Sequence, residues 1–154
     1  MMQARIHTAT LADLEPVAQL FDAYRQFYDY PADLSLASAY IAQRLQQGES
    51  VVLLAREAAG SALGFCQLYP TFCSLEAQPI YALYDLYVAP AARGAGVGNQ
   101  LLLAAEQTAR DHGMCRLDLT TAKTNLPAQA AYEALGWVRD EVYFAYSKAV
   151  AAPD

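Results

Sequence analysis

The stretch RGAGVGN, residues 93–99, holds three of the chain's eight glycines within five positions. It lies between the apolar run IYALYDLYV, residues 80–88, and the helix-like run GNQLLLAAEQTAR, residues 98–110. Where a strand leads into a helix, the first helical N–H groups have no partner within the helix and carry partial positive charge. Glycines remove the Cβ atoms that would keep a phosphate away from these groups. With Arg93 as a cation at its mouth, the loop predicts a pyrophosphate site.

Two other phosphate-binding loops fit this stretch poorly. A P-loop has Lys and then Ser or Thr after its last glycine, whereas Asn99 and Gln100 follow here. A dinucleotide loop, G-x-G-x-x-G, would need a third glycine at the position of Asn99. Too few residues follow Gly98 in a chain of 154 residues for the rest of a dinucleotide fold. A connector in which the glycines occur by chance stays as the alternative.

Size and composition limit the class of protein. With 154 residues, 55% of them hydrophobic, the chain is expected to form a single domain, residues 1–154, with a real core. The formal net charge of −6 argues against a nucleic-acid binder, which needs a basic face. No apolar run is long enough to span a membrane, and the N-terminus does not look like a signal peptide. Cys66, Cys73 and Cys115 lack metal-ligand spacing, so a cytoplasmic protein with reduced thiols and no metal is expected.

The apolar periodicity and the breaks predict an α/β (α+β) domain with the element order β-α-α-β-β-β-α-β-α-β. Thr10 is the expected N-cap of the first helix, and Gly48 is expected to end the second. The strands are expected at residues 3–10, 50–56, 62–69, 80–88, 115–121 and 142–150. The helices are expected at residues 11–28, 35–47, 98–112 and 125–136, and residues 70–79 are expected to form a loop.

The pattern R-x-x-G-x-G, from Arg93 to Gly98, has a second motif downstream of it. In LDLTTAKTNLPAQAAYEALGW, residues 117–137, a strand leads to Asn125, and Tyr132 follows seven residues later, just before Gly136. In this order the motifs resemble the GCN5-related N-acetyltransferase (GNAT) family, over roughly residues 80–146. The segments DLYVAP, YRQFYDYP and GFCQLYP are similar to the branch that includes histone, polyamine and D-amino-acid N-acetyltransferases.

The resemblance implies a mixed central sheet splayed around acetyl-CoA, whose pyrophosphate the glycine loop would hold. Main-chain groups of the central strand would pair with the pantetheine arm, and one strand N–H would polarise the acetyl carbonyl. The implied acetyl-CoA contacts are Leu86, Tyr87, Val88, Arg93, Gly94, Ala95, Gly96, Val97, Gly98, Asn99, Asn125 and Tyr132.

The resemblance also implies that Tyr132 protonates the departing thiolate. A tyrosine suits this role because its ordinary pKa, near ~10, keeps it protonated at neutral pH. A tyrosine that only packs on a helix face is the alternative. Asn125 has an alternative role too, as the N-cap of a helix with Pro127 in its first turn.

The proton acceptor is less clear from the sequence. Related polyamine acetyltransferases carry a glutamate at the position of Tyr84, immediately before Asp85. Alternation along a strand sends Tyr84 and Asp85 to opposite faces. Asp85 therefore either reaches the amine through a bulge, as base or ammonium anchor, or is structural while a water relay removes the proton.

The expected acceptor is a small primary amine: a polyamine, an amino acid or an aminated metabolite. Tyr24, Tyr28 and Tyr84 are the predicted substrate contacts, since aromatic rings bind ammonium groups or apolar side chains. A protein lysine or N-terminus, or a CoA-binding module without turnover, are the alternatives. Nucleic acid and membranes are not expected as partners, and family analogy favours a homodimer.

Overall fold

The computed structural model describes residues 3–151 and divides into two compact units on either side of Thr120 and Thr121. The first unit contains β1 (Arg5–Thr8), the 3₁₀ turn η1 (Leu11–Asp13), α1 (Leu14–Phe27), α2 (Leu34–Gln47), β2 (Val51–Arg56), β3 (Ala62–Cys73), β4 (Gln78–Val88), the 3₁₀ turn η2 (Pro90–Ala92), α3 (Val97–Asp111) and β5 (Leu117–Asp118). The second unit contains α4 (Leu126–Ala134). The predicted domain of residues 1–154 includes termini that lie outside the described residues.

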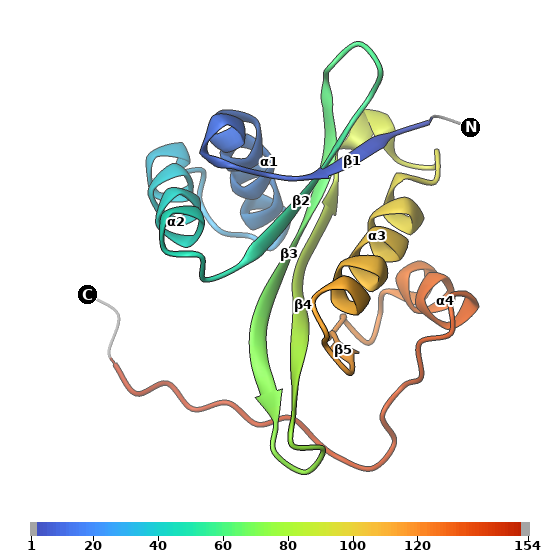
Figure 1. Cartoon of the computed structure of the whole chain (residues 1–154). Coiled ribbons are helices and arrows are strands. Elements are labelled where there is room, and N and C mark those ends of the chain that lie inside the picture. Colours follow the sequence, from blue (N-terminus) through green and yellow to red (C-terminus); the bar gives the residue numbers. More distant parts are fainter. Residues whose placement is uncertain (1–2, 152–154) are drawn as a thin grey trace. The chain divides into compact units, whose positions relative to one another are not determined.

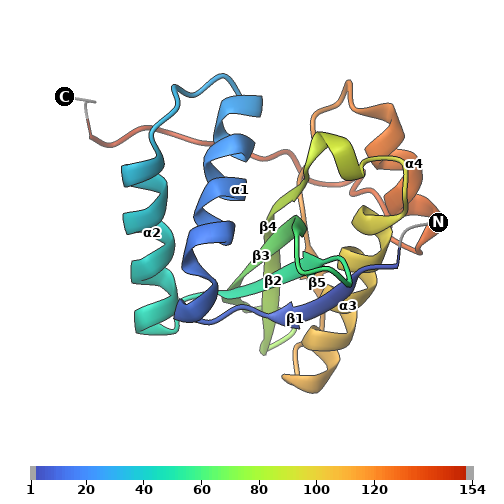
Figure 2. The same ribbon diagram turned by 90° about the horizontal axis from the view of Figure 1, so that it is seen from above.

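The first unit is built on one five-stranded sheet in the order β1-β2-β3-β4-β5. The first four strands are antiparallel neighbours, and β5 runs parallel to β4, so the sheet is mixed, as predicted. Helices α1 and α2 lie side by side on one face of the sheet and α3 lies on the other (Figures 1 and 2). Parallel pairing of β4 and β5 requires a crossover, and α3 supplies it.

Local signals place the first helices where the sequence predicted them. The Thr10 hydroxyl accepts a hydrogen bond from the Ala12 amide, and the Asp13 carboxylate accepts one from the Thr10 amide, which completes a capping box. The Asp33 side chain caps α2 by accepting a hydrogen bond from the Leu36 amide. Gly48 ends α2 in the left-handed conformation with a φ of 62°, which costs glycine little because it has no Cβ.

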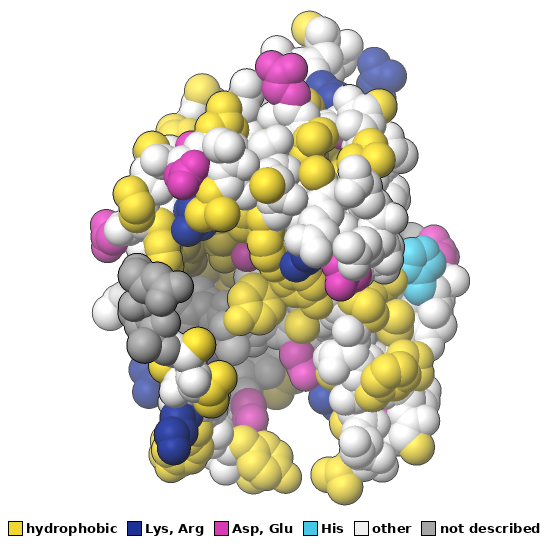
Figure 3. Space-filling view, turned by 90° about the vertical axis from the view of Figure 1, so that its left-hand side faces the viewer, with side chains coloured by type: hydrophobic (Ala, Val, Ile, Leu, Met, Phe, Trp, Pro, Cys, Tyr) yellow, Lys and Arg dark blue, Asp and Glu magenta, His cyan; other side chains and the backbone are white. Residues whose placement is uncertain are grey.

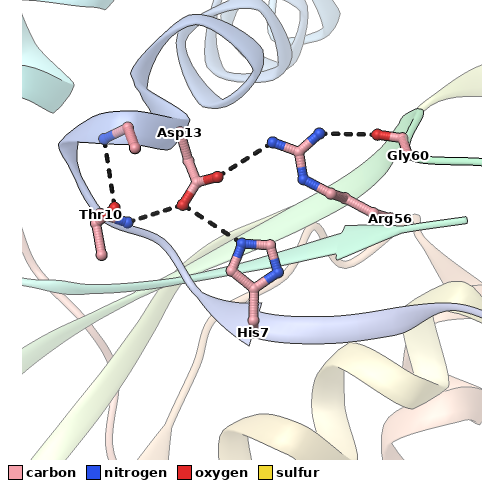
Figure 4. A network of polar contacts seen from close by, with 6 residues as sticks. His7, Thr10, Asp13, Arg56 and Gly60 are labelled. Atoms are coloured by element: carbon pink, nitrogen blue, oxygen red, sulfur yellow. Dashed lines mark hydrogen bonds and ion pairs between the residues drawn. The ribbon is translucent and has the colours of Figure 1, made fainter.

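A polar network fastens the start of α1 to the sheet (Figure 4). The Asp13 carboxylate lies 3.1 Å from Nη2 of Arg56, at the end of β2, and 3.4 Å from Nε2 of His7, on β1. Arg56 also donates from Nη1 to the carbonyl of Gly60, in the β2–β3 turn, at 2.8 Å. The network thus joins β1, η1 and the β2–β3 hairpin, which explains His7 as a structural residue.

The core explains why the central strands read as continuous apolar runs. Val52 and Leu54 of β2 pack toward α1 and α2 with Phe65 of β3, while Leu53 and Ala55 are buried on the other face. A strand covered on both faces loses the alternating pattern of a half-exposed strand. The buried apolar residues of α3 are Val97, Leu101, Leu102, Ala105 and Ala109.

Close approach of β3 and β4 requires glycine at position 64. A Cβ at Gly64 would lie 2.7 Å from the carbonyl oxygen of Tyr87 and 3.2 Å from Cα of Val88. Both atoms belong to the backbone and cannot move aside cheaply, so a larger residue would push the strands apart. Gly64 therefore fixes the position of the β4 segment that leads into the glycine loop.

The prediction that residues 70–79 form a loop is wrong, because β3 continues to Cys73 and β4 begins at Gln78. Proline suggested a break, since it cannot donate to a central strand. However, β2 pairs with β3 only as far as Leu68, so Pro70 faces a single neighbour, Tyr81 of β4. This part of β3 is an edge, where a missing N–H is tolerated.

Two predictions near the C-terminus are also corrected. The strand expected at residues 115–121 is only Leu117–Asp118, and residues 142–150 form no strand. Alternating apolar residues favour a strand, but a strand forms only with a hydrogen-bonded partner strand, and the structure describes none for residues 142–150. Val142, Phe144 and Tyr146 are accordingly exposed. Within residues 3–151, each helix is too short or too polar to cross a bilayer.

Candidate functional site

A cavity of about 500 Å³ opens in the first unit between α1, α2 and strands β3 and β4. Its walls are mostly aromatic, in keeping with the hydrophobic side chains visible on the side that carries α1 and α2 (Figure 3). Tyr24, Tyr28, Tyr84 and Asp85, which the sequence singled out, all line it. The complete lining is Phe21, Tyr24, Arg25, Tyr28, Tyr30, Tyr40, Tyr69, Tyr84 and Asp85.

A β-bulge in β4 turns Tyr84 and Asp85 toward this cavity together. Gln67 pairs with Asp85, but the next residue of β3, Leu68, pairs with Leu83, so Tyr84 is the extra residue. A bulge breaks the alternation of faces and redirects side chains. The expectation that Tyr84 and Asp85 lie on opposite sides is therefore wrong, and the bulge that the first alternative required is present, while the role of Asp85 as base or structural residue stays a prediction.

Asp85 is a buried carboxylate, 5% exposed, at the wall of the cavity. It accepts a hydrogen bond from Nε2 of Gln67 at 2.8 Å, and Gln67 is held in turn by the Ser50 hydroxyl at 2.8 Å. Burial raises the pKa of the Asp85 carboxyl, while hydrogen bonds from Gln67 and Tyr24 oppose that rise. No cation of the described residues forms an ion pair with Asp85, so an ammonium ion entering the cavity would supply the missing positive charge.

Tyrosine side chains line much of the cavity, and the hydroxyl of Tyr24 is a hydrogen-bond donor rather than a base. Burial and the neighbouring Asp85 raise the pKa of Tyr24, which keeps its hydroxyl protonated. That hydroxyl lies 3.4 Å from the carbonyl oxygen of Tyr84, a long contact. Tyr40 and Tyr69 share a hydrogen bond of 2.6 Å between their hydroxyls. Asp85 is thus the one carboxylate of the cavity lining, and its pKa is raised by burial.

The glycine loop after β4 has the geometry that its sequence predicted. Gly94 and Gly96 have φ values of 78° and 84°, in the region that side chains disfavour. Helix α3 begins at Val97, one residue before the expected start, with Gly96 as its N-cap and no side-chain cap. Its first N–H groups therefore lack the usual hydrogen-bond acceptor from a capping side chain and can bind an anion.

Arg93 links this loop to the end of β4. Its Nε donates to the carbonyl oxygen of Val88 at 2.9 Å, and its guanidinium lies over the rings of Phe27 and Tyr87, 5.6 and 5.4 Å from their centroids. Leu86, Tyr87 and Val88, the predicted contacts of the pantetheine arm, are therefore held next to the loop.

Asn125 and Tyr132 belong to the second unit. The Asn125 side chain accepts a hydrogen bond from the Ala128 amide at 3.2 Å, so it is the N-cap of α4, as its alternative role predicted. The Tyr132 ring lies on α4, with its centroid 6.0 Å from that of Trp137. The roles of both residues toward acetyl-CoA stay predictions.

The cysteines do not offer a nucleophile at the cavity. Cys66 is fully buried on β3, and this burial raises the pKa of its thiol to about 12. Cys73 and Cys115 are not part of the cavity lining. Nor does the described part of the chain gather three His, Cys, Asp or Glu side chains in a metal-binding cluster.

Sequence reasoning missed part of the cavity. Arg25, Tyr40 and Tyr69 come from α1, α2 and β3, and only the packing of those elements brings them together. The partner of Asp85 could have been found: Gln67 is a polar residue within the apolar strand GFCQLY, and such a residue needs a buried hydrogen-bond partner.

Comparison with known proteins gives a consistent result. Residues 15–137 match the model of the acetyltransferase (GNAT) family. The chain is 42% identical over 141 residues to a Bacillus subtilis protein named uncharacterized N-acetyltransferase YhfO, covering 92% of this chain and 94% of that protein. A crystal structure of a probable acetyltransferase has 37% sequence identity and a TM-score of 0.90, covering 97% of this chain and 99% of the other.

Two further relatives carry the names of acceptor molecules. The aminoglycoside N(6')-acetyltransferase type 1 of Stenotrophomonas maltophilia is 32% identical, with 90% of each chain covered. The L-methionine sulfoximine/L-methionine sulfone acetyltransferase of Pseudomonas paraeruginosa is also 32% identical, with 73% of this chain and 67% of that protein covered.

Proposed function

The chain belongs to the acetyltransferase (GNAT) family, and we propose that it transfers the acetyl group of acetyl-CoA directly to the primary amine of a small molecule. The observation that supports a small amine as the acceptor is the buried, hydrogen-bonded carboxylate of Asp85 in an aromatic cavity. A volume of about 500 Å³ is within the usual range of small-molecule sites. A protein lysine or N-terminus is the alternative acceptor, and a CoA-binding module without turnover is the alternative to catalysis.

Asp85 is proposed as the group that removes a proton from the acceptor. An amine with a pKa near ~10.4 is almost entirely protonated at pH 7, and reaching its neutral form costs roughly 4 to 5 kcal/mol. A carboxylate within the cavity binds the ammonium form and then accepts its proton. The neutral nitrogen attacks the thioester carbonyl, so that an N–C bond forms, the C–S bond breaks and the nitrogen gives up its second proton, which replaces the one that the thiolate receives.

Tyr132 is proposed to donate a proton to the departing thiolate, which leaves as the free thiol of CoA. A main-chain N–H between Leu86 and Val88 would polarise the carbonyl during attack. In this proposal the glycine loop binds the pyrophosphate and the aromatic cavity holds the acceptor next to Asp85. Asp85 takes a proton from the amine, and Tyr132 gives one to the thiolate.

A thermal-shift experiment tests the proposed acetyl-CoA site. A ligand at ~100 times its Kd adds about 2.7 kcal/mol to the free energy of unfolding. For a domain of this size, the melting temperature is expected to rise by roughly 5 to 11 °C with acetyl-CoA and with CoA, but not with NAD. If neither CoA species raises the melting temperature, the glycine loop does not bind acetyl-CoA and the proposal fails.

We also propose that two copies of the chain associate, and the support is the exposed segment of residues 142–150. Four of its alternating apolar residues are 77 to 96% exposed: Val142, Phe144, Tyr146 and Val150. Large exposed apolar patches usually mark contact surfaces.

The single domain of residues 1–154 and the cytoplasmic location stay predictions.

Analytical ultracentrifugation tests this association. The wild-type chain of 16.8 kDa is expected to sediment as a dimer at micromolar concentration, and a Phe144→Asp, Tyr146→Asp double variant as a monomer. A wild-type monomer, or a variant that stays dimeric, would contradict the proposed contact.

A further inference from the structure

Resting on the proposed function, we propose that the acceptor is an amino acid, with its amine at Asp85 and its carboxylate at Arg25. Both side chains line the same cavity, so its lining contains one acidic and one basic residue. A zwitterion complements both charges at once, whereas a polyamine complements Asp85 alone.

Among the arginines of residues 3–151, Arg25 is distinguished by having neither a side-chain hydrogen bond nor an ion pair, whereas Arg44, whose Nε is also buried without a hydrogen bond, forms an ion pair with Glu49. Arg25 lies in the last turn of α1, and its Nη1 atom is buried. A buried N–H without an acceptor is costly, and arginine carries five donors that fit a carboxylate in two-pronged geometry. This guanidinium is therefore available to a ligand.

The other arginines of the described chain show that this is unusual here. Each of them has an anionic or carbonyl oxygen within bonding distance. Five form ion pairs, namely Arg44 with Glu49, Arg56 with Asp13, Arg110 with Glu106, Arg116 with Asp118, and Arg139 with Glu141. Two donate to carbonyl groups, namely Arg5 to Ala58 and Arg93 to Val88.

Arg25 contacts the Tyr30 ring, and this contact orients its side chain without providing a hydrogen-bond acceptor. The guanidinium carbon lies 5.1 Å from the centre of the Tyr30 ring, another residue of the cavity lining. This cation–π contact attracts the guanidinium to the ring, but the N–H groups of the guanidinium still require an oxygen acceptor. A substrate carboxylate supplies two such oxygens.

The rest of the lining suits the side chain of an amino acid. Phe21, Tyr40, Tyr69 and Tyr84 provide aromatic surface in the same cavity as the two charged residues. Such surface favours an apolar or aromatic side chain, while Arg25 repels a second ammonium group. Polycationic acceptors, including polyamines, are therefore expected to be poor substrates.

The first test compares each amino acid with its own amide in a thiol-release assay, using a panel of apolar and aromatic L- and D-amino acids. The amide keeps the amine and the side chain but loses the carboxylate. We expect kcat/KM for the best amino acid to exceed that for its amide by at least ~10-fold. The amine of the amide is less basic and is more often in the reactive neutral form. This difference favours the amide, so a higher kcat/KM for the amino acid must come from its carboxylate.

Three variants test whether Arg25 causes the preference for the amino acid over its amide. Arg25→Met is expected to lower kcat/KM for the amino acid and to leave that for the amide unchanged, so that the ratio falls to about one. Arg25→Lys keeps a positive charge and is expected to retain part of the preference. Arg110→Met, which removes an exposed charge elsewhere, is the matched control and is expected to behave like the wild type.

A binding measurement makes the inference independent of turnover. With CoA present, amino acids are expected to raise the melting temperature of the wild type and not that of Arg25→Met. Failure of the proposed function appears as no thiol release with any amine of the panel. The inference alone is overturned if amides or spermidine are acetylated as well as the amino acids, if Arg25→Met lowers both activities equally, or if no amino acid is bound.

Discussion

Replacing Asp85 with asparagine is expected to lower kcat/KM for amine acetylation by at least about 100-fold, since a positioned general base contributes 10²- to 10⁴-fold. Asparagine has the same shape and can still accept the hydrogen bond from Gln67, but it cannot take up a proton. Thiol release under saturating acetyl-CoA measures the effect. Asp111→Asn, which changes an exposed carboxylate at the end of α3, is the matched control.

The stability of the Asp85→Asn variant separates lost chemistry from lost folding. Burial raises the pKa of Asp85 in the folded chain above its unfolded value. Its contribution to stability is therefore fully present below the unfolded pKa, near ~3.9, and is lost as the pH rises through the folded pKa. Asparagine does not titrate, so the variant is expected to melt at or above the wild-type temperature at pH 8 and to lose that advantage toward pH 4.

The same titration predicts the pH dependence of the wild type. Since the base must be unprotonated, kcat/KM should fall as the pH drops through the raised pKa of Asp85. This loss at acidic pH should be absent from the residual activity of Asp85→Asn. An Asp85→Asn variant with wild-type kcat/KM would show instead that water carries the proton away and that Asp85 is structural.

Replacing Tyr132 with phenylalanine is expected to lower kcat at least ~10-fold while the Kd for acetyl-CoA stays nearly unchanged, because acid assistance to the thiolate is lost and the ring is kept. The Tyr132 ring contact with Trp137 does not require the hydroxyl, so the fold of α4 should persist. Steady-state thiol release gives kcat, and titration calorimetry gives the Kd.

Tyr143→Phe is the matched control for this variant, since it removes one hydroxyl from a residue that is 76% exposed in the same unit. If Tyr132→Phe turns over at the wild-type rate, Tyr132 has no part in proton transfer. If acetyl-CoA binding and kcat both fall together, the residue positions the thioester rather than protonating the thiolate.

Much of the fold could be predicted from the sequence because its signals are local. Thr10 and Gly48 bound helices through groups within four residues of them, and the glycines at 94 and 96 adopt the positive φ angles that their residue type permits. The strand–glycine loop–helix order likewise depends on consecutive residues. These features gave the α/β class, the order of elements through α4 and the proposed pyrophosphate site.

Errors arose where a residue's structure depends on a distant partner. Pro70 stays within β3 because β2 has already ended beside it, a fact about another strand. The alternating apolar residues of 142–150 form no strand in the structure. Periodicity shows what a segment prefers, but pairing decides whether a strand forms.

The sequence by itself determined the elements, their caps and the loop, because each depends on interactions among residues close in the chain. Only the tertiary structure decided that Tyr84 and Asp85 share a cavity, since the bulge is set by the register of β4 against Gln67 and Leu68. It also decided that Arg25 joins them there, although 60 positions separate it from Asp85 in the sequence. Residue type fixes local backbone geometry, whereas register and packing fix which side chains meet.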